Sequence, residues 1–102
     1  MDTSTLRPNF ESAFELLGKR WTGLIIRVML SGKQRFSEIH VVIPSISDRM
    51  LTKRLKELQT MGIVQRRVYP EVPVRIEYEL TEMGKSLAPV MDSVQQWATS
   101  WA

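Results

Sequence analysis

The chain has 102 residues, with 14 Lys or Arg against 11 Asp or Glu and a formal net charge of +3. This length suits one domain, 1–102, and a hydrophobic content of 43% is enough to fill one small core. The absence of cysteine excludes disulfides, thiolate metal sites and thiol catalysis, and a single histidine argues against a histidine-built metal or acid–base site. We therefore expect no enzyme, no metal and no cofactor.

Apolar residues occur only in short runs. The longest runs have three residues, as in Leu24-Ile25-Ile26, and the N-terminus lacks the basic start and apolar stretch of a signal peptide. We expect a cytoplasmic protein with no membrane partner.

Positive charge is concentrated in the middle of the chain. Residues 19–67 hold eleven basic side chains against three acidic ones, a net +8, whereas 1–18 and 68–102 sum to −2 and −3. A basic block between acidic ends favours a polyanionic partner, and a merely solvated basic face is the alternative interpretation.

Helical periodicity predicts three helices in the first part of the chain. The first covers 9–17, with Asn9 as its N-cap and Gly18 as its stop. The second, over 21–30, is apolar around most of its circumference, which is typical of a central helix covered on most sides. A short third helix packs one apolar face and stops before Pro44.

A fourth helix has two chemically different faces. It begins after the N-cap Ser47 and ends near Gly62. At about 100° per residue, its apolar side holds Leu51, Leu55 and Leu58. The opposite side is cationic and holds Arg49, Lys53 and Lys56, with Thr52 at the border.

The apolar period then changes to two. This change predicts strands over 63–69 and 74–80, joined into a hairpin by a stiff proline-flanked turn at 70–73. The residues of the second strand that are expected to face inward are Ile76, Tyr78 and Leu80.

The last element is predicted as one helix capped by Thr81 and ending at Trp101, with a bend near Lys85 to Pro89 because a proline removes a backbone hydrogen bond. Its apolar residues repeat with the period of a helix–helix seam: Met83, Leu87, Val90, Val94, Trp97 and Trp101. One small core cannot easily cover two terminal tryptophans, so we expect this stripe to join two copies of the chain, with Phe10 and Phe14 as candidates for the facing surface. Packing on the domain's own core is the alternative.

This order of elements is that of a mainly helical winged helix-turn-helix domain with a small β-hairpin. The segment 35–62 is the helix-turn-helix, 63–80 the wing, 9–17 and 81–101 the dimerisation helices and 1–8 an N-terminal arm. The fourth helix would enter the DNA major groove. The residues expected to contact DNA from it and the preceding turn are Ser45, Ser47, Arg49, Met50, Thr52, Lys53 and Lys56.

The wing carries a further candidate. Arg75, beside the hairpin tip, could reach a phosphate or the minor groove, or could instead pair with Glu77 or Glu79. Arg66 and Arg67 point to opposite faces of their strand, so at most one of them is expected near DNA. A winged helix that serves only as a protein–protein module is the rival hypothesis, and it predicts no salt-dependent DNA affinity.

Several ordered motifs, spread over about 11–98, resemble the HxlR-type bacterial transcription regulators, relatives of the MarR-like winged helix proteins. The residues that carry the resemblance are Leu16-Leu17-Gly18-Lys19-Arg20-Trp21-Thr22, Arg35-Phe36-Ser37-Glu38-Ile39, Ile46-Ser47, Met50-Leu51-Thr52, Arg54-Leu55-Lys56-Glu57-Leu58, Tyr69-Pro70-Glu71-Val72-Pro73 and Leu80-Thr81-Glu82-Met83-Gly84. The resemblance implies a cytoplasmic homodimer, joined through its first and last helices, that binds a near-palindromic operator. It also implies that the helix after Ser47 reads DNA and that the tip at 70–75 is the wing. We expect a repressor rather than an activator.

One departure from that family matters. A branch that senses quinones and other electrophiles has a cysteine directly before the proline preceding the first helix, and here that place reads Arg7-Pro8. An inducer of this chain would therefore have to bind noncovalently, for example in an apolar cleft near Phe14, Trp21 and Trp97.

Overall fold

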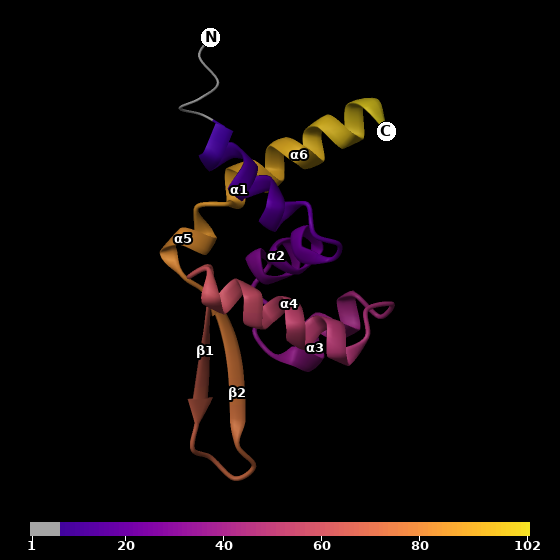
Figure 1. Ribbon diagram of the computed structural model, residues 1–102. Coiled ribbons are helices and arrows are strands. Elements are labelled where there is room, and N and C mark those ends of the chain that lie inside the picture. The colour runs from indigo at the N-terminus through magenta and orange to yellow at the C-terminus, as the bar shows by residue number, and fades with distance from the viewer. Residues whose placement is uncertain (1–6) are drawn as a thin grey trace.

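The computed structural model describes the backbone from residue 7 and the side chains from residue 9 to Ala102. In this part of the chain, the helices gather together and one antiparallel hairpin projects away from them (Figure 1). The elements in chain order are α1 (Arg7–Leu17), α2 (Thr22–Leu30), α3 (Phe36–Val42), α4 (Asp48–Thr60), β1 (Val64–Tyr69), β2 (Arg75–Leu80), α5 (Glu82–Lys85) and α6 (Ala88–Trp101). The predicted class, mainly helical with a two-stranded hairpin, is confirmed.

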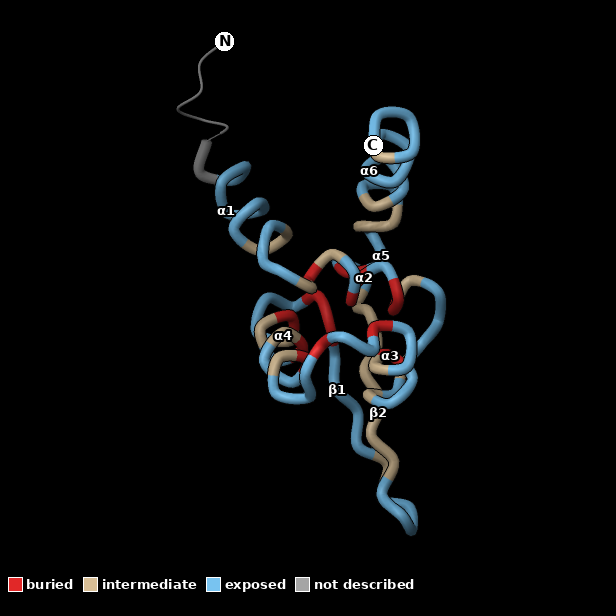
Figure 2. Tube along the Cα trace, turned by 90° about the vertical axis from the view of Figure 1, so that its right-hand side faces the viewer, coloured by how far each residue is buried: buried red, intermediate tan, exposed pale blue. Residues whose placement is uncertain are grey.

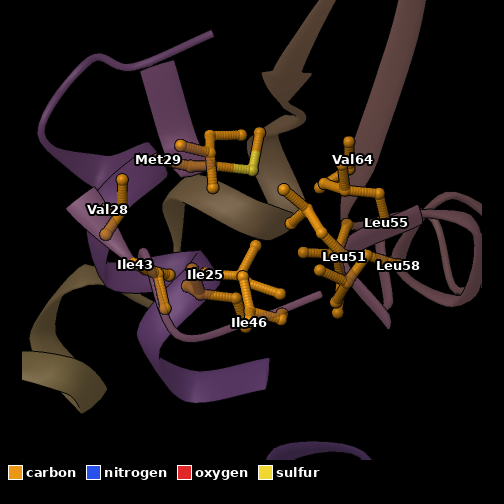
Figure 3. Packing of buried hydrophobic residues seen from close by; sticks show 12 residues of the cluster. Ile25, Val28, Met29, Ile43, Ile46, Leu51, Leu55, Leu58 and Val64 are labelled. Atoms are coloured by element: carbon orange, nitrogen blue, oxygen red, sulfur yellow. The ribbon is translucent and has the colours of Figure 1, made fainter. Parts of the chain in front are cut away.

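The core lies between α2, α3, α4 and the start of β1. In Figure 3 the leucines of α4 gather on one side and face isoleucines from α2 and from the turn before α4. The buried hydrophobic residues are Ile25, Ile26, Val28, Met29, Ile39, Ile43, Ile46, Leu51, Leu55, Leu58, Ile63 and Val64. The described residues of α1 and α6 contribute none of them, so both helices lie outside the core.

The molecule is elongated because its two ends project from this core. Its radius of gyration is 15.2 Å, whereas a compact domain of this size has about 13 Å. Figure 2 shows α1 and α6 leaving one side of the core along different directions, while the hairpin extends from the opposite side.

Two predicted details at the helix ends are wrong. Asn9 is not the N-cap of the first helix, because α1 already begins at Arg7 and Asn9 lies inside it. Pro8 sits in the first turn, where a helix does not use the missing N–H, so the proline permits this earlier start. The expected arm, 1–8, therefore loses its last two residues to α1, and 1–6 lie outside the described residues.

The last predicted helix is two helices. Thr81 caps α5 as expected, since its Oγ1 accepts a hydrogen bond from Gly84 N at 3.2 Å. The bend expected before Pro89 is a full break, because Ser86 and Leu87 separate α5 from α6 and Pro89 lies in the first turn of α6. Met83 is thus on α5 and is not part of a continuous seam with the tryptophans.

The predicted hairpin is an antiparallel pair, in which Val68 lies opposite Ile76 and Val64 opposite Leu80. Tyr78 and Leu80 pack against the core as expected, but all residues of β2 are half-buried, so exposure does not alternate along this strand. Long charged side chains cover the outer face, and one example is the pair of Arg67 Nε and Glu79 Oε2 at 2.9 Å.

Candidate nucleic-acid interface

The turn between α3 and α4 sets the start of the candidate reading helix. Ser47 caps α4, and its Oγ accepts a hydrogen bond from Met50 N at 3.1 Å. His40 of α3 has its Nε2 2.9 Å from the Ile46 carbonyl oxygen and 3.5 Å from Asp48 Oδ1. These contacts fix both sides of the turn, so α4 leaves it in a defined direction.

The outer face of α4 is cationic and open to solvent. Leu51, Leu55 and Leu58 are buried, as the periodicity predicted. The exposed side chains on the opposite side are Arg49, Thr52, Lys53 and Lys56. None of the three basic ones has an ion-pair partner among the side chains from residue 9 onward. Their charge is therefore available to an external polyanion.

The other predicted contacts on this side differ from one another. Ser45 and Ser47 are exposed at the turn, although the Ser47 hydroxyl is already used as a cap. Met50 is half-buried and packs against the core, so only part of its side chain faces outward. The structure thus places Ser45, Ser47 and Met50 at the N-terminal end of α4, but Met50 also packs against the core.

A polar network behind α4, which the sequence analysis did not identify, fixes this helix. Arg54 Nε donates to the Arg20 carbonyl oxygen at 2.9 Å, and Arg54 Nη1 lies 2.9 Å from Glu57 Oε1. Lys19 Nζ approaches the other oxygen of Glu57 at 2.9 Å. The hydrogen bond from Lys19, assisted by Arg54, lowers the pKa of Glu57, so its carboxylate stays ionised.

Most of this network was hidden because its partners are far apart in the sequence. Arg20 and Arg54 are separated by 34 positions, and Lys19 and Glu57 by 38. The only local signal was the i,i+3 spacing of Arg54 and Glu57 on one helix face. Since the Arg54 side chain is only 12% exposed, this arginine holds α4 in place and is not part of the cationic outer face.

At the wing, Arg75 is held by acidic neighbours. Its Nη2 lies 3.0 Å from Glu71 Oε1 and its Nη1 2.5 Å from Glu77 Oε1. The guanidinium also sits 3.8 Å from the centre of the Tyr69 ring. The hydrogen bonds to Glu71 and then Glu77 raise the pKa of Arg75. Of the two interpretations left open, pairing with Glu77 is present, and Glu71 is an additional partner.

The rest of the hairpin is anchored to the helix-turn-helix. Tyr78 N donates to the Gln34 carbonyl oxygen at 2.7 Å, which ties β2 to the segment before α3. Arg67 is paired with Glu79. Arg66 is exposed and has no ion pair in the described part of the chain, so it is the freer of the two strand arginines.

Large apolar side chains are exposed on the two projecting helices. The exposed fractions are 64% for Phe10, 58% for Phe14, 66% for Trp97 and 80% for Trp101. Val90 and Val94 are also exposed, on the same face of α6 as the tryptophans. Leu87 differs from the rest of the predicted dimer surface, because it is half-buried against the core of its own chain.

The cleft expected near Phe14, Trp21 and Trp97 does not coincide with the cavities beside α1. Those cavities are lined by α1, α4, α5 and the start of β1, and none of these three aromatic residues borders them.

Neither a membrane span nor a metal cluster is found in the region that the structure describes. No helix there has the length and apolar character needed to cross a bilayer. No group of three or more potential acidic or histidine ligands there could hold a metal ion.

A capped, outwardly cationic helix in a helix-turn-helix, followed by an anchored hairpin, defines a winged helix DNA-binding protein. Residues 16–102 match the HxlR-like helix-turn-helix family. The chain therefore belongs to the HxlR family of transcriptional regulators, which are not enzymes.

Individual relatives agree with this assignment. The chain is 52% identical over 101 residues to the uncharacterized HTH-type transcriptional regulator YvaP of Bacillus subtilis, covering 99% of this chain and 94% of the relative. The reduced form of the transcriptional regulator YodB from B. subtilis superposes with a TM-score of 0.84 at 53% identity, covering 93% of both chains. The redox regulator HypR in its oxidized form superposes with a TM-score of 0.85 at 40% identity, covering 92% of this chain and 97% of that chain.

Proposed function

We propose that this regulator acts in the cytoplasm as a homodimer that represses transcription by occupying a near-palindromic operator. In each protomer α4 reads the major groove through its exposed face, with Arg49 and Lys53 closest to base edges and Lys56 on the backbone. The wing lies beside it, and Arg75 at its tip stays close to the phosphates. The observation that carries this proposal is the cationic face of α4, opposite its buried leucines, whose basic side chains have no ion-pair partner from residue 9 onward.

The exposed apolar faces of α1 and α6 support the dimer. Two aromatic residues on each helix lie in water in a single chain, and surfaces of this kind usually have a partner. A second copy supplies a matching surface without a further protein, because a two-fold interface uses the same patch on both subunits. A dimer also places two reading helices on one side of the duplex, about 34 Å apart.

The experiment begins with selection of genomic fragments that the purified protein retains. Footprinting on the selected fragments should show two protected half-sites with centres about 10 bp apart or a multiple of this distance. Affinity should fall steeply as salt rises, because cationic side chains displace counterions from phosphates. A single unpaired site, or binding that ignores salt, would contradict the proposal.

The sign of regulation needs a separate measurement. Deleting the gene for this protein should raise transcription from a promoter that contains a selected site. Restoring the wild-type gene should lower transcription again, while a gene carrying Arg49→Ala and Lys53→Ala should not. A fall in transcription after deletion would identify an activator instead.

A further inference from the structure

Two cavities lie next to each other beneath α1. One has a volume of about 280 Å³ and is lined by Ser12, Ala13, Leu16, Leu17, Met61, Ile63, Met83, Ser86 and Leu87. The other has a volume of about 700 Å³ and extends along α4. Since both are lined by Ser12, Leu16 and Met61, they adjoin and form one groove, the α1–α4 groove.

The two ends of this groove have opposite chemistry. At the α5 end the lining is almost entirely aliphatic or methionine side chains. At the α4 end it includes three lysines, Lys19, Lys53 and Lys56, against the two acids Glu15 and Glu57. Ligand pockets typically combine such an apolar body with a few polar groups that fix orientation, in volumes of about 300–1,000 Å³.

The charges at the α4 end leave cations in excess. Glu57 is already compensated by Lys19 and by Arg54, each 2.9 Å away. Lys53 and Lys56 have no ion-pair partner among the side chains from residue 9 onward. An anionic group at this end would therefore meet two ammonium groups that pair with no carboxylate from residue 9 onward, beside one carboxylate, Glu15, on the same lining.

We propose that the α1–α4 groove binds a small hydrophobic carboxylate, with its apolar chain toward Ala13, Met83 and Leu87 and its carboxylate at Lys53 and Lys56. This inference rests on the proposed function for its consequence, since the same two lysines are assigned to DNA. A ligand that engages them withdraws them from DNA, so the carboxylate and DNA weaken each other's binding. The chain has no cysteine, and this site gives it a response that needs no thiol.

The phenylalanines proposed for the dimer and part of the groove lining lie on different sides of α1. At about 100° per residue, Phe10 and Phe14 lie on roughly the opposite side of α1 from Ser12 and Leu16. A second copy that covers the two phenylalanines therefore leaves the side of α1 with Ser12 and Leu16 uncovered, whereas Leu17, at the apolar end of the groove, lies on the same side of α1 as Phe10.

The site itself is tested without DNA by titration calorimetry with decanoate, kept below its micelle-forming concentration. The wild type should bind it. Ala13→Trp and Met83→Trp, which fill the apolar end from two different helices, should each weaken binding at least about tenfold, while Gln95→Trp on α6 should not. Circular dichroism checks that the variants fold. If one of the two groove-filling variants does not fold, the other still tests the site.

The charge preference and the coupling to DNA form the second part of the test. Decyltrimethylammonium should not bind at the same concentrations, because its cationic group meets lysines. Saturating decanoate should weaken binding of a selected operator fragment by about tenfold in the wild type, within the usual range of coupling between two sites, and should have little effect in the two groove-filling variants.

Each contrary result has a distinct meaning. No heat of decanoate binding, equal binding of the decyl cation, or unchanged binding in both groove-filling variants would overturn the site. Decanoate binding with no loss of operator affinity would overturn the coupling. Failure of the proposed function would show separately, as absence of operator binding before any decanoate is added.

Discussion

Arg75 and Glu71 close the tip of the hairpin, with Arg75 Nη2 3.0 Å from Glu71 Oε1 and Arg75 Nε 3.2 Å from Glu71 Oε2. Because of this contact, the arginine that is proposed to approach phosphates has an acidic side chain directly beside it. Glu71 therefore limits how much positive charge the wing offers to DNA.

Replacing Glu71 with glutamine should increase DNA affinity. The guanidinium, which then keeps only Glu77 as an acidic partner, can contact a phosphate, and each added contact should steepen the slope of log affinity against log salt by about 0.9. Fluorescence anisotropy at several salt concentrations measures both quantities. Glu82→Gln removes the same charge from α5, where Glu82 lies 3.5 Å from Lys85, and serves as the control. An unchanged slope would show that Arg75 only fastens the hairpin.

Replacing Arg49 with alanine and replacing Lys56 with alanine should weaken DNA binding in different ways. Arg49 lies in the first turn of α4, so its loss should cost about 1–3 kcal/mol on the preferred operator and relax the preference at one base pair. Lys56 lies further along the helix, so its loss should weaken all DNA sequences alike and reduce the salt slope by about 0.9. Competition binding against single-base operator variants separates the two patterns.

Lys85→Ala is the matched control, because Lys85 is an exposed lysine on α5 that already pairs with Glu82. If Arg49→Ala lowered affinity equally for all base pairs, Arg49 would be a phosphate contact and not a reader.

The two faces of α4 could be predicted because a single helix carries the information. Its leucines and its basic residues recur at helical spacing, and the structure buries the first set and exposes the second. The order of helices and hairpin was accessible for the same reason, since each element has its own period and its own end signals.

Contacts between distant segments could not be predicted in this way. Nothing local to Arg20 indicates that its carbonyl oxygen accepts a hydrogen bond from Arg54. The break before α6 was only partly visible, because Pro89 signals a disturbance but the packing of Leu87 against the core determines where the chain turns. At the wing, the hairpin geometry determines which acidic side chains pair with Arg75. It places Glu71 and Glu77 beside Arg75 and pairs Glu79 with Arg67.

Two glycine-to-alanine substitutions should shift stability in opposite directions. A Cβ on the buried Gly84 would overlap the Ile63 carbonyl oxygen and lie 3.0 Å from Leu80 Cδ2, so Gly84→Ala should lower the free energy of unfolding by about 1–3 kcal/mol. A Cβ on Gly23 would meet nothing within 4 Å, so Gly23→Ala should raise it by about 0.5–1 kcal/mol through better helix propensity. Urea unfolding of both variants measures the difference, and equal losses would contradict the close approach of α5 to Ile63 and Leu80.

The ion pair between Lys19 and Glu57 should affect how the free energy of unfolding depends on pH in the acid range. Because these contacts lower the pKa of folded Glu57 below its ordinary 4.5, they stabilise the protein above that value. The stabilisation is lost as the pH falls through the lowered pKa, where the folded protein takes up the proton. Glu57→Gln should therefore be less stable than the wild type at neutral pH, and the difference should shrink below pH 4.5.

Lys19→Met supplies an independent check of the same pair, because it removes the largest cause of the lowered pKa and leaves the carboxylate in place. The free energy of unfolding of this variant should lose part of the same pH dependence. A constant difference between wild type and Glu57→Gln from pH 7 to pH 3 would show that the ion pair contributes nothing to folding.

Changing Trp97 and Trp101 to alanine should separate the proposed dimer. Both side chains are more than half exposed in one chain, and large aromatic residues at the centre of an interface typically contribute about 2 kcal/mol or more each. Sedimentation velocity should show a dimer for the wild type and a monomer for the double variant at the same concentration. Gln95→Ala is the control, since Gln95 bonds to Thr99 on the other side of α6 and should leave the dimer intact. The double variant should also bind a single half-site with nearly normal affinity but lose the advantage of the full operator, because a monomer gains nothing from the second half-site. A double variant that sediments like the wild type would place the dimer interface elsewhere.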